Sequence, residues 1–300
     1  MKEAQTASIS VPVGRTSTRF ADYFALTKPR LNFLVVATSA AGYYLGASGP
    51  VEFGSMASAV AGTALVAGGA AVLNQVYERD TDALMRRTRM RPLPDGRVGP
   101  ADATTFGMAL SAAGLGLLAL RANLAAALLA LATLVIYLLV YTPMKRRSHV
   151  ATLLGAVPGA LPPLIGWTAS HGSSSSGGLA LFGIVFLWQI PHFMAIAWLY
   201  RDDYGKAGFP LLPVLESDGK RTGRHAVAFA AALVPATLIP VMLGVSGLVY
   251  AAVAVLLGAA LLWLAIQFAG MRTDTAARRL FFGSIAYLPL LWIAMIANRV

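Results

Sequence analysis

The sequence has no cysteine and few charged side chains. Of its 300 residues, charged ones make up 12% and hydrophobic ones 57%. Without cysteine the chain can form no disulfide and offers no thiolate nucleophile or thiolate metal ligand. A soluble domain carries about 25% charged residues, so this chain has too little charge to cover a surface that faces water. The composition excludes a soluble enzyme and a disulfide-rich secreted module, and it predicts an integral membrane protein.

The hydrophobic residues gather in runs of about 20, the length of helix that crosses roughly 30 Å of hydrocarbon. We therefore predict an all-α, polytopic membrane protein with nine transmembrane helices. The expected spans cover residues 31–49, 57–77, 103–120, 124–142, 151–169, 178–199, 226–245, 248–268 and 280–297. Residues 1–25 lack the apolar core of a signal peptide. We expect them to form a polar cytoplasmic segment, followed by a single transmembrane domain over residues 26–300.

The net charge of +11 could indicate binding to nucleic acid, but the basic residues follow a membrane topology instead. With nine spans, 22 of the 24 Lys and Arg lie on one side, and Arg121 and Arg299 are the exceptions. The positive-inside rule makes that side cytoplasmic. We expect an inner-membrane protein with a cytoplasmic N-terminus, a C-terminus on the opposite side, the lipid bilayer as a partner and no nucleic acid.

Acidic residues collect where the second expected span ends. Asn74, Glu78 and Asp82 are spaced four residues apart, so a helix that continues through residue 82 carries all three on one face. Two carboxylates and an amide oxygen are hard oxygen donors that suit Mg²⁺. Arg87 and Arg91 follow, again four residues apart, and guanidinium groups bind phosphate with two donors. The pattern predicts a site for a metal and a diphosphate.

A second polar segment ends the sixth expected span on the same side. It reads Trp188-Gln-Ile-Pro-His192-Phe, continues apolar to Tyr200, and then contains Asp202, Asp203 and Lys206. Taken alone, Asp202 and Asp203 are also compatible with an ordinary loop, and His192 with a hydrogen-bonded core histidine. A third basic element, Lys145-Arg-Arg, follows the fourth expected span.

These segments, together with Leu26-Thr-Lys-Pro-Arg30 and the Gly- and Pro-rich residues 155–167, resemble the UbiA superfamily of intramembrane prenyltransferases. The resemblance is closest to the branch that farnesylates heme. It implies nine helices around a central cavity open to the cytoplasmic face, with Mg²⁺ as cofactor. It implies transfer of the farnesyl group of farnesyl diphosphate to a vinyl group of heme B with addition of water. A downstream heme-modifying membrane enzyme is an implied partner.

The resemblance also implies roles for individual residues. Glu78 stands where the superfamily usually has aspartate, and Leu199 replaces the first of two aspartates spaced four apart in its second motif, of which Asp203 fits the other. The implied catalytic residues are Asn74, Glu78, Asp82 and Asp203. The implied Mg²⁺ ligands are Glu78, Asp82, Asp202 and Asp203. The implied diphosphate-binding residues are Arg30, Arg87, Arg91, Lys145 and Lys206. Trp188 and His192 are implied to contact the acceptor, because histidine is a common iron ligand.

Two other functions remain open from the sequence. One is prenyl transfer by the same fold to another aromatic, quinone-precursor or tetrapyrrole acceptor. The other is a transporter, since transporters also use charged residues and broken helices at membrane depth. A transporter does not need carboxylates and arginines concentrated at one membrane face, so the pattern favours the enzyme.

Overall fold

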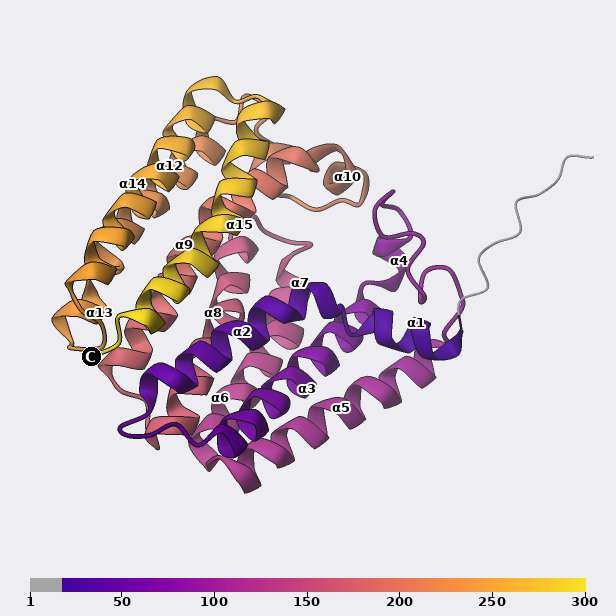
Figure 1. The fold of residues 1–300 in the computed structure, drawn as a ribbon. Helices are drawn as coiled ribbons and strands as arrows, with labels where there is room; N and C mark the ends of the chain where they lie inside the picture. The colour runs from indigo at the N-terminus through magenta and orange to yellow at the C-terminus, as the bar shows by residue number, and fades with distance from the viewer. Residues whose placement is uncertain (1–17) are drawn as a thin grey trace, which may run out of the picture.

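The computed structural model describes residues 18–300, and the regular elements in that range are helices (Figure 1). Extended backbone pairs there only in an isolated bridge between Ser246 and Arg299. Residues 1–17 of the predicted polar segment, with Lys2 and Arg15, lie outside the described residues. Most of its remainder forms helix α1 (Arg19–Leu26), which the apolar runs did not predict because it is short and carries charge.

Each expected span coincides with one helix or with consecutive helices. These elements are α2 (Pro29–Gly46), α3 (Phe53–Tyr77), α5 (Pro100–Arg121), α6 (Leu124–Val135) continued by η1 (Ile136–Tyr141) and α7 (Thr142–Met144), α8 (Ala151–His171), α9 (Ser176–Leu199), α12 (Lys220–Ala236) with α13 (Ile239–Met242), α14 (Leu248–Met271) and α15 (Asp274–Ala297). The short helices α4 (Arg79–Asp82), α10 (Arg201–Lys206) and α11 (Leu212–Leu215) lie between them.

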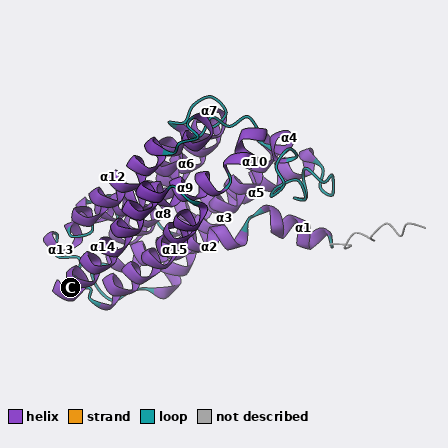
Figure 2. Cartoon of the chain, turned by 90° about the horizontal axis from the view of Figure 1, so that it is seen from above, coloured by secondary structure: helices purple, strands orange, loops and turns teal. Residues whose placement is uncertain are grey.

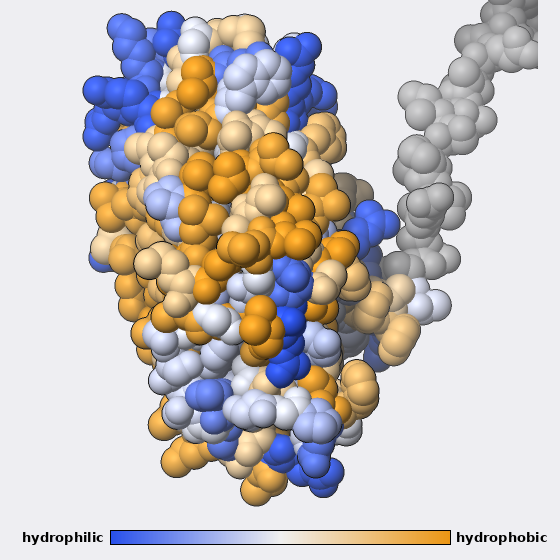
Figure 3. Space-filling model, turned by 60° about the vertical axis from the view of Figure 1, so that its left-hand side comes forward, coloured by the Kyte–Doolittle hydropathy of each residue, from blue (hydrophilic) through white to orange (hydrophobic). Residues whose placement is uncertain are grey.

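Seven helical segments within residues 18–300 are long and apolar enough to cross a membrane. Helices α2 and α8 coincide with expected spans but are not among these seven. Helix α2 begins with polar residues, including Arg30 and Asn32, and α8 contains three prolines. Both features lower the mean hydropathy of a helix without removing it from the bundle. Figure 3 shows apolar side chains over the middle of one face, with hydrophilic side chains gathered toward its two ends.

The long helices form a closed arrangement in which the first and last adjoin (Figure 1). Helix α3 packs along α5, α2 along α8, and α9 contacts α8, α12 and α15. Helix α15 contacts α2, which closes the circuit. The short helices α4 and α10 lie side by side at one end of the bundle in both views (Figures 1 and 2). The two polar segments singled out from the sequence therefore meet at the same end.

Helices α2 and α8 approach so closely that glycine is required on both. A Cβ atom on Gly42 would lie 2.0 Å from the carbonyl oxygen of Pro163, and one on Gly166 would lie 1.9 Å from that of Ser39. Since the opposing atoms are backbone, a larger residue forces the helices apart. Close approach through small residues is how helices associate within a membrane, where the lipid is as apolar as the protein.

We expect Gly166→Ala to lower the free energy of unfolding by about 1–3 kcal/mol, the usual range for an overpacked core. Denaturation of the purified protein in detergent micelles measures this difference. Gly183→Ala on α9 is the matched control, because no atom lies within 4 Å of the added methyl group. The control should be neutral or slightly stabilising, since alanine favours helix over glycine. Equal stability of the two variants would show that the α2–α8 contact does not limit stability.

Candidate active site

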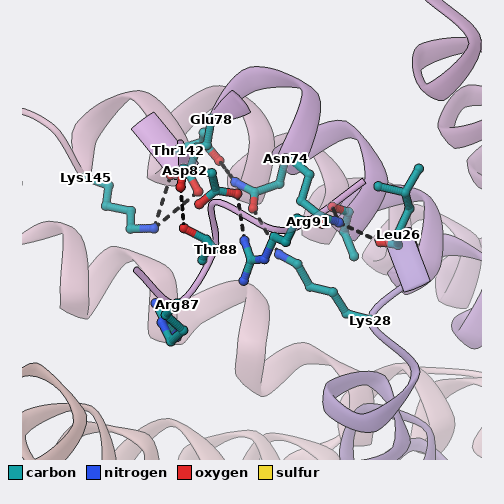
Figure 4. A network of polar contacts seen from close by, with 12 residues as sticks. Leu26, Lys28, Asn74, Glu78, Asp82, Arg87, Thr88, Arg91, Thr142 and Lys145 are labelled. Atoms are coloured by element: carbon teal, nitrogen blue, oxygen red, sulfur yellow. Dashed lines mark hydrogen bonds and ion pairs between the residues drawn. The ribbon is translucent and has the colours of Figure 1, made fainter. Parts of the chain in front are cut away.

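The three polar residues at the end of α3 converge and are buried. Asn74, Glu78 and Asp82 are 3%, 5% and 1% exposed. The expected continuous helix is wrong in one detail: α3 ends at Tyr77, Glu78 departs from helical geometry, and α4 then begins. The backbone bonds from Glu78 N to Asn74 O (2.9 Å) and from Asp82 N to Glu78 O (2.8 Å) bridge this break. The three side chains therefore still lie on one side (Figure 4).

Two cations pair with the two carboxylates. Lys145 Nζ lies 3.1 and 3.3 Å from the two carboxylate oxygens of Glu78. Arg91 Nη1 donates to Asp82 Oδ2 at 2.7 Å. Thr88 fixes the intervening turn, because its hydroxyl donates to the carbonyl of Asp82 at 2.7 Å. Buried charges need such partners, and the pairs bring together residues up to 67 positions apart in the sequence.

The amide of Asn74 has a defined orientation. Its Nδ2 donates to Thr142 Oγ1 at 3.1 Å, while the Thr142 hydroxyl donates to Tyr137 O at 2.7 Å. The hydroxyl proton is thus used, and Thr142 accepts from the amide. This leaves Asn74 Oδ1 as an oxygen donor on the same side as the carboxylates, where Lys28 Nζ approaches it at 3.5 Å.

Lys28 is a site residue that was not assigned a function from the sequence. It adopts a left-handed backbone conformation (φ 50°), which is uncommon for a non-glycine residue. The turn is held because Gln75 Nε2 donates to Leu26 O and Asn32 Nδ2 to Thr27 O, both at 2.6 Å. The turn directs Lys28 to Asn74, whereas the predicted Arg30 is exposed. The only sequence signal was the Lys-Pro pair that precedes α2.

The cluster carries an excess of positive charge. Burial, together with the nearby guanidinium of Arg91, lowers the pKa of Lys28 to about 7. Among residues 18–300, Lys28, Arg91 and Lys145 gather around two carboxylates, those of Glu78 and Asp82. The carboxylates of Glu78 and Asp82 raise the pKa of Lys28, but burial outweighs them, so an anionic ligand bound here would favour the charged form of Lys28. We define these residues with Asn74 as the buried charge cluster.

A second, more open site adjoins the buried charge cluster. This charged pocket has a volume of about 530 Å³ and is lined by Arg86, Arg87, Arg89, Leu199, Tyr200, Asp202, Asp203 and Lys206. Arg87 connects the two polar segments: its guanidinium lies 5.2 Å from the ring centre of Tyr200 and donates to Tyr204 Oη at 3.3 Å. The predicted residues Asp202, Asp203 and Lys206 thus face arginines of the first segment.

The buried charge cluster has a donor set suited to Mg²⁺. This ion takes one or two carboxylates and completes its shell with water and substrate phosphate. Glu78, Asp82 and Asn74 Oδ1 supply two carboxylates and one amide oxygen. Within residues 18–300 no three acidic or histidine side chains converge as a metal cluster. Asp202 and Asp203 therefore do not join Glu78 and Asp82 in one cluster.

The two residues assigned to the acceptor lie where α9 packs on α15. Trp188 is 4% exposed, and its Nε1 donates to the carbonyl of Ser284 at 2.9 Å. His192 Nδ1 lies 2.8 Å from the Ser284 hydroxyl, and its ring is partly exposed. Sequence reasoning missed Ser284, since a lone serine in an apolar helix gives no signal.

The fold and site define an intramembrane enzyme class. The model of the UbiA prenyltransferase family matches residues 35–289, and the chain belongs to this family. It is an integral, multi-pass membrane protein. Similar proteins include the protoheme IX farnesyltransferases of Koribacter versatilis, 41% identical over 98% of each chain, and of Anaeromyxobacter sp., 48% identical over 91% of this chain and 92% of that one.

Solved structures share the fold at low identity. A UbiA homolog from Archaeoglobus fulgidus bound to DMAPP and Mg²⁺ matches with a TM-score of 0.69 at 18% identity, over 92% of this chain and 99% of that one. A digeranylgeranylglyceryl phosphate synthase matches with a TM-score of 0.79 at 16% identity, over 93% and 98% of the two chains.

Proposed function

We propose that the chain transfers the farnesyl group of farnesyl diphosphate to a vinyl group of heme B, with addition of water, to give heme O and diphosphate. Relatives 41–48% identical over most of the chain are named protoheme IX farnesyltransferase. The observation that carries the proposal is the buried charge cluster, in which acid and base side chains meet at one end of a bundle of apolar helices.

The architecture proposed for this function is a single domain over residues 26–300, with nine transmembrane helices around a cavity that opens to the cytoplasmic face. The N-terminus lies in the cytoplasm and the C-terminus on the other side of the inner membrane. The distribution of basic residues, 22 of 24 on one side, supports this orientation. Farnesyl diphosphate then binds with its diphosphate at the cytoplasmic end, in the buried charge cluster, and with its farnesyl chain among the apolar helices, while heme B enters from the bilayer.

The residues of the buried charge cluster fit binding of a metal and a diphosphate. Glu78, Asp82 and Asn74 Oδ1 would hold Mg²⁺, which when bound supplies positive charge to the leaving diphosphate. Lys145 and Arg91 exchange their carboxylate partners for diphosphate oxygens and stabilise the charge that develops on them. In the charged pocket, Asp202 and Asp203 would bind metal apart from Glu78 and Asp82, and Arg87 and Lys206 would bind the diphosphate. Arg30, exposed at the start of α2, is proposed as a further cation for the diphosphate.

The carbon chemistry requires a dry site. Cleavage of the bond between C1 and oxygen of farnesyl diphosphate leaves an allylic cation, which bulk water would capture. The apolar helices exclude that water. The vinyl group of heme B attacks C1, the new cation forms next to the macrocycle, and one water molecule adds there and loses a proton. Trp188 and His192 contact the heme, and heme O passes to a downstream heme-modifying membrane enzyme.

Expression of the chain in cells that lack heme O tests the activity directly. Extracted hemes should contain a species heavier than heme B by one farnesyl group plus one water. Formation of a different prenylated product, with heme B unchanged, would support the alternative acceptor instead. Omission of Mg²⁺ from membranes of these cells should stop diphosphate release.

We expect Arg91→Ala to raise the KM for farnesyl diphosphate by about 10- to 100-fold, because a charge-assisted bond to phosphate is lost. Steady-state kinetics in isolated membranes measures it. The control is Arg79→Ala, whose guanidinium pairs with the exposed Asp80 outside the buried charge cluster. An unchanged KM in Arg91→Ala would remove this residue from the diphosphate site.

A further inference from the structure

A single serine on α15 holds both residues of α9 that are assigned to the acceptor. Ser284 is fully buried. Its carbonyl oxygen accepts from Trp188 Nε1 at 2.9 Å, and its hydroxyl lies 2.8 Å from His192 Nδ1. Two contacts at one residue fix how the Trp188 and His192 side chains lie against α15.

The two contacts of the Ser284 hydroxyl are satisfied together by one tautomer of His192. The serine hydroxyl donates its one proton to the carbonyl of Phe281, at 2.7 Å. Its oxygen then accepts from the histidine, so Nδ1 carries the ring proton and Nε2 carries a lone pair. Within residues 18–300, His192 Nε2 has no hydrogen-bond partner. His192 as a residue is partly exposed, and an imidazole nitrogen with a free lone pair can act as a ligand or a base.

Aromatic stacking fixes the plane of the ring. His192 lies between Trp188, at 5.1 Å and 20° between planes, and Phe281, at 5.2 Å and 25°. The stack, together with the bond to Ser284, restricts rotation about both side-chain torsions. The lone pair of Nε2 therefore has one direction.

His192 lies on the face of α9 that leads to the charged pocket. Leu199, which lines that pocket, is seven residues further along the same uninterrupted helix. Seven residues are nearly two turns, so His192 and Leu199 share a face and lie roughly 10 Å apart along the axis. A ligand held at His192 is thus deeper in the membrane than the charged pocket, and its rim can approach the site of prenyl cleavage.

We propose that Ser284 is a positioning residue that presents Nε2 of His192 to the iron of the heme acceptor. This inference rests on the proposed function, which makes heme a substrate. Iron binds the unprotonated nitrogen of imidazole, and a hydrogen bond from the other nitrogen fixes the ring and raises its basicity. The Ser284 oxygen accepts that hydrogen bond, while stacking against Trp188 and Phe281 fixes the orientation of the imidazole plane.

The test uses the full chain in lipid nanodiscs, titrated with hemin and followed by absorption and, after reduction, by resonance Raman spectroscopy. The wild type should show an iron–imidazole stretching band. Ser284→Ala should weaken hemin binding by about tenfold and lower the frequency of this band, because Nδ1 loses its acceptor. Ser284→Thr keeps the hydroxyl and should restore the frequency. His192→Ala should lose the band, and added imidazole should restore ligation.

Ser111→Ala on α5 is the matched control, because Ser111 is also buried and bonds the carbonyl four residues earlier in its helix. It should leave both readouts unchanged.

Suppose that the wild-type protein makes heme O but that the iron–imidazole band is unaltered in His192→Ala. This result would overturn the inference and leave the proposed function intact. A wild type that makes no heme O would instead contradict the proposed function. Reduced turnover in Ser284→Ala with an unshifted band would make Ser284 merely structural and also overturn the inference. If His192→Ala does not insert, the two Ser284 variants decide alone.

Discussion

Replacing Asp82 by asparagine should lower the rate of heme O formation by at least about 10³-fold while the protein remains inserted in the membrane. The change keeps the shape of a side chain that is 1% exposed and removes only its charge. A proposed metal ligand is weakened, and Arg91, bonded to this carboxylate at 2.7 Å, becomes a cation without a counter-ion. Heme O formed in isolated membranes, at saturating farnesyl diphosphate and Mg²⁺, measures the loss.

Asp80→Asn is the control for this variant. Asp80 lies two residues earlier in α4, but its side chain is 88% exposed and pairs with Arg79 outside the buried charge cluster. Exposed pairs contribute little, so its activity should stay within about twofold of the wild type. An equal loss in both variants would indicate damage to α4. Full activity in Asp82→Asn would exclude the residue from catalysis.

Lys145→Met should lower kcat/KM for farnesyl diphosphate by about 10²- to 10³-fold. Methionine retains the length of the side chain and its contact with Phe209, whose ring centre lies 4.7 Å from Nζ. The ammonium group that pairs with Glu78 and that we assign to the leaving diphosphate is lost. Kinetics in nanodiscs separates this effect from insertion, and Lys145→Arg should recover part of the activity because it restores the charge.

The adjacent Arg146 is exposed and provides the comparison for Lys145. Arg146→Met removes a positive charge from the same loop, and it should affect topology and lipid contacts more than turnover. If Arg146→Met and Lys145→Met lose activity equally, the loop acts through its overall charge and not through the contact with Glu78.

The long helices were predictable from the sequence because the thickness of the bilayer sets their length. Each apolar run of about 20 residues therefore marks one helix. The convergence of Asn74, Glu78 and Asp82 was predictable for a similar reason, since spacing by four residues is a local property of a helix. Even the break at Glu78 did not separate these side chains, because the hydrogen bonds that span it keep the helical pattern.

The partners of those side chains were not predictable, because they depend on how distant segments fold. Arg91 reaches Asp82 through an irregular turn that is tied by Thr88 and, further along, by a bond from Arg97 to the buried Asp22 of α1. Lys28 reaches Asn74 only through a left-handed backbone conformation. Neither arrangement leaves a periodic signal in the sequence.

The pairing of Glu78 with Lys145 and of Asp82 with Arg91 has a consequence for the order of loading. Under the proposed function, a divalent ion that binds alone meets carboxylates already paired with two cations, and a diphosphate that binds alone meets cations already paired with two carboxylates. When both bind, the metal ion takes the place of Lys145 and Arg91 at the carboxylates, and the diphosphate pairs with these two displaced cations. Binding of either one therefore raises the affinity for the other, by the same factor in both directions. We therefore expect the metal ion and the diphosphate to bind cooperatively, each more weakly alone than together.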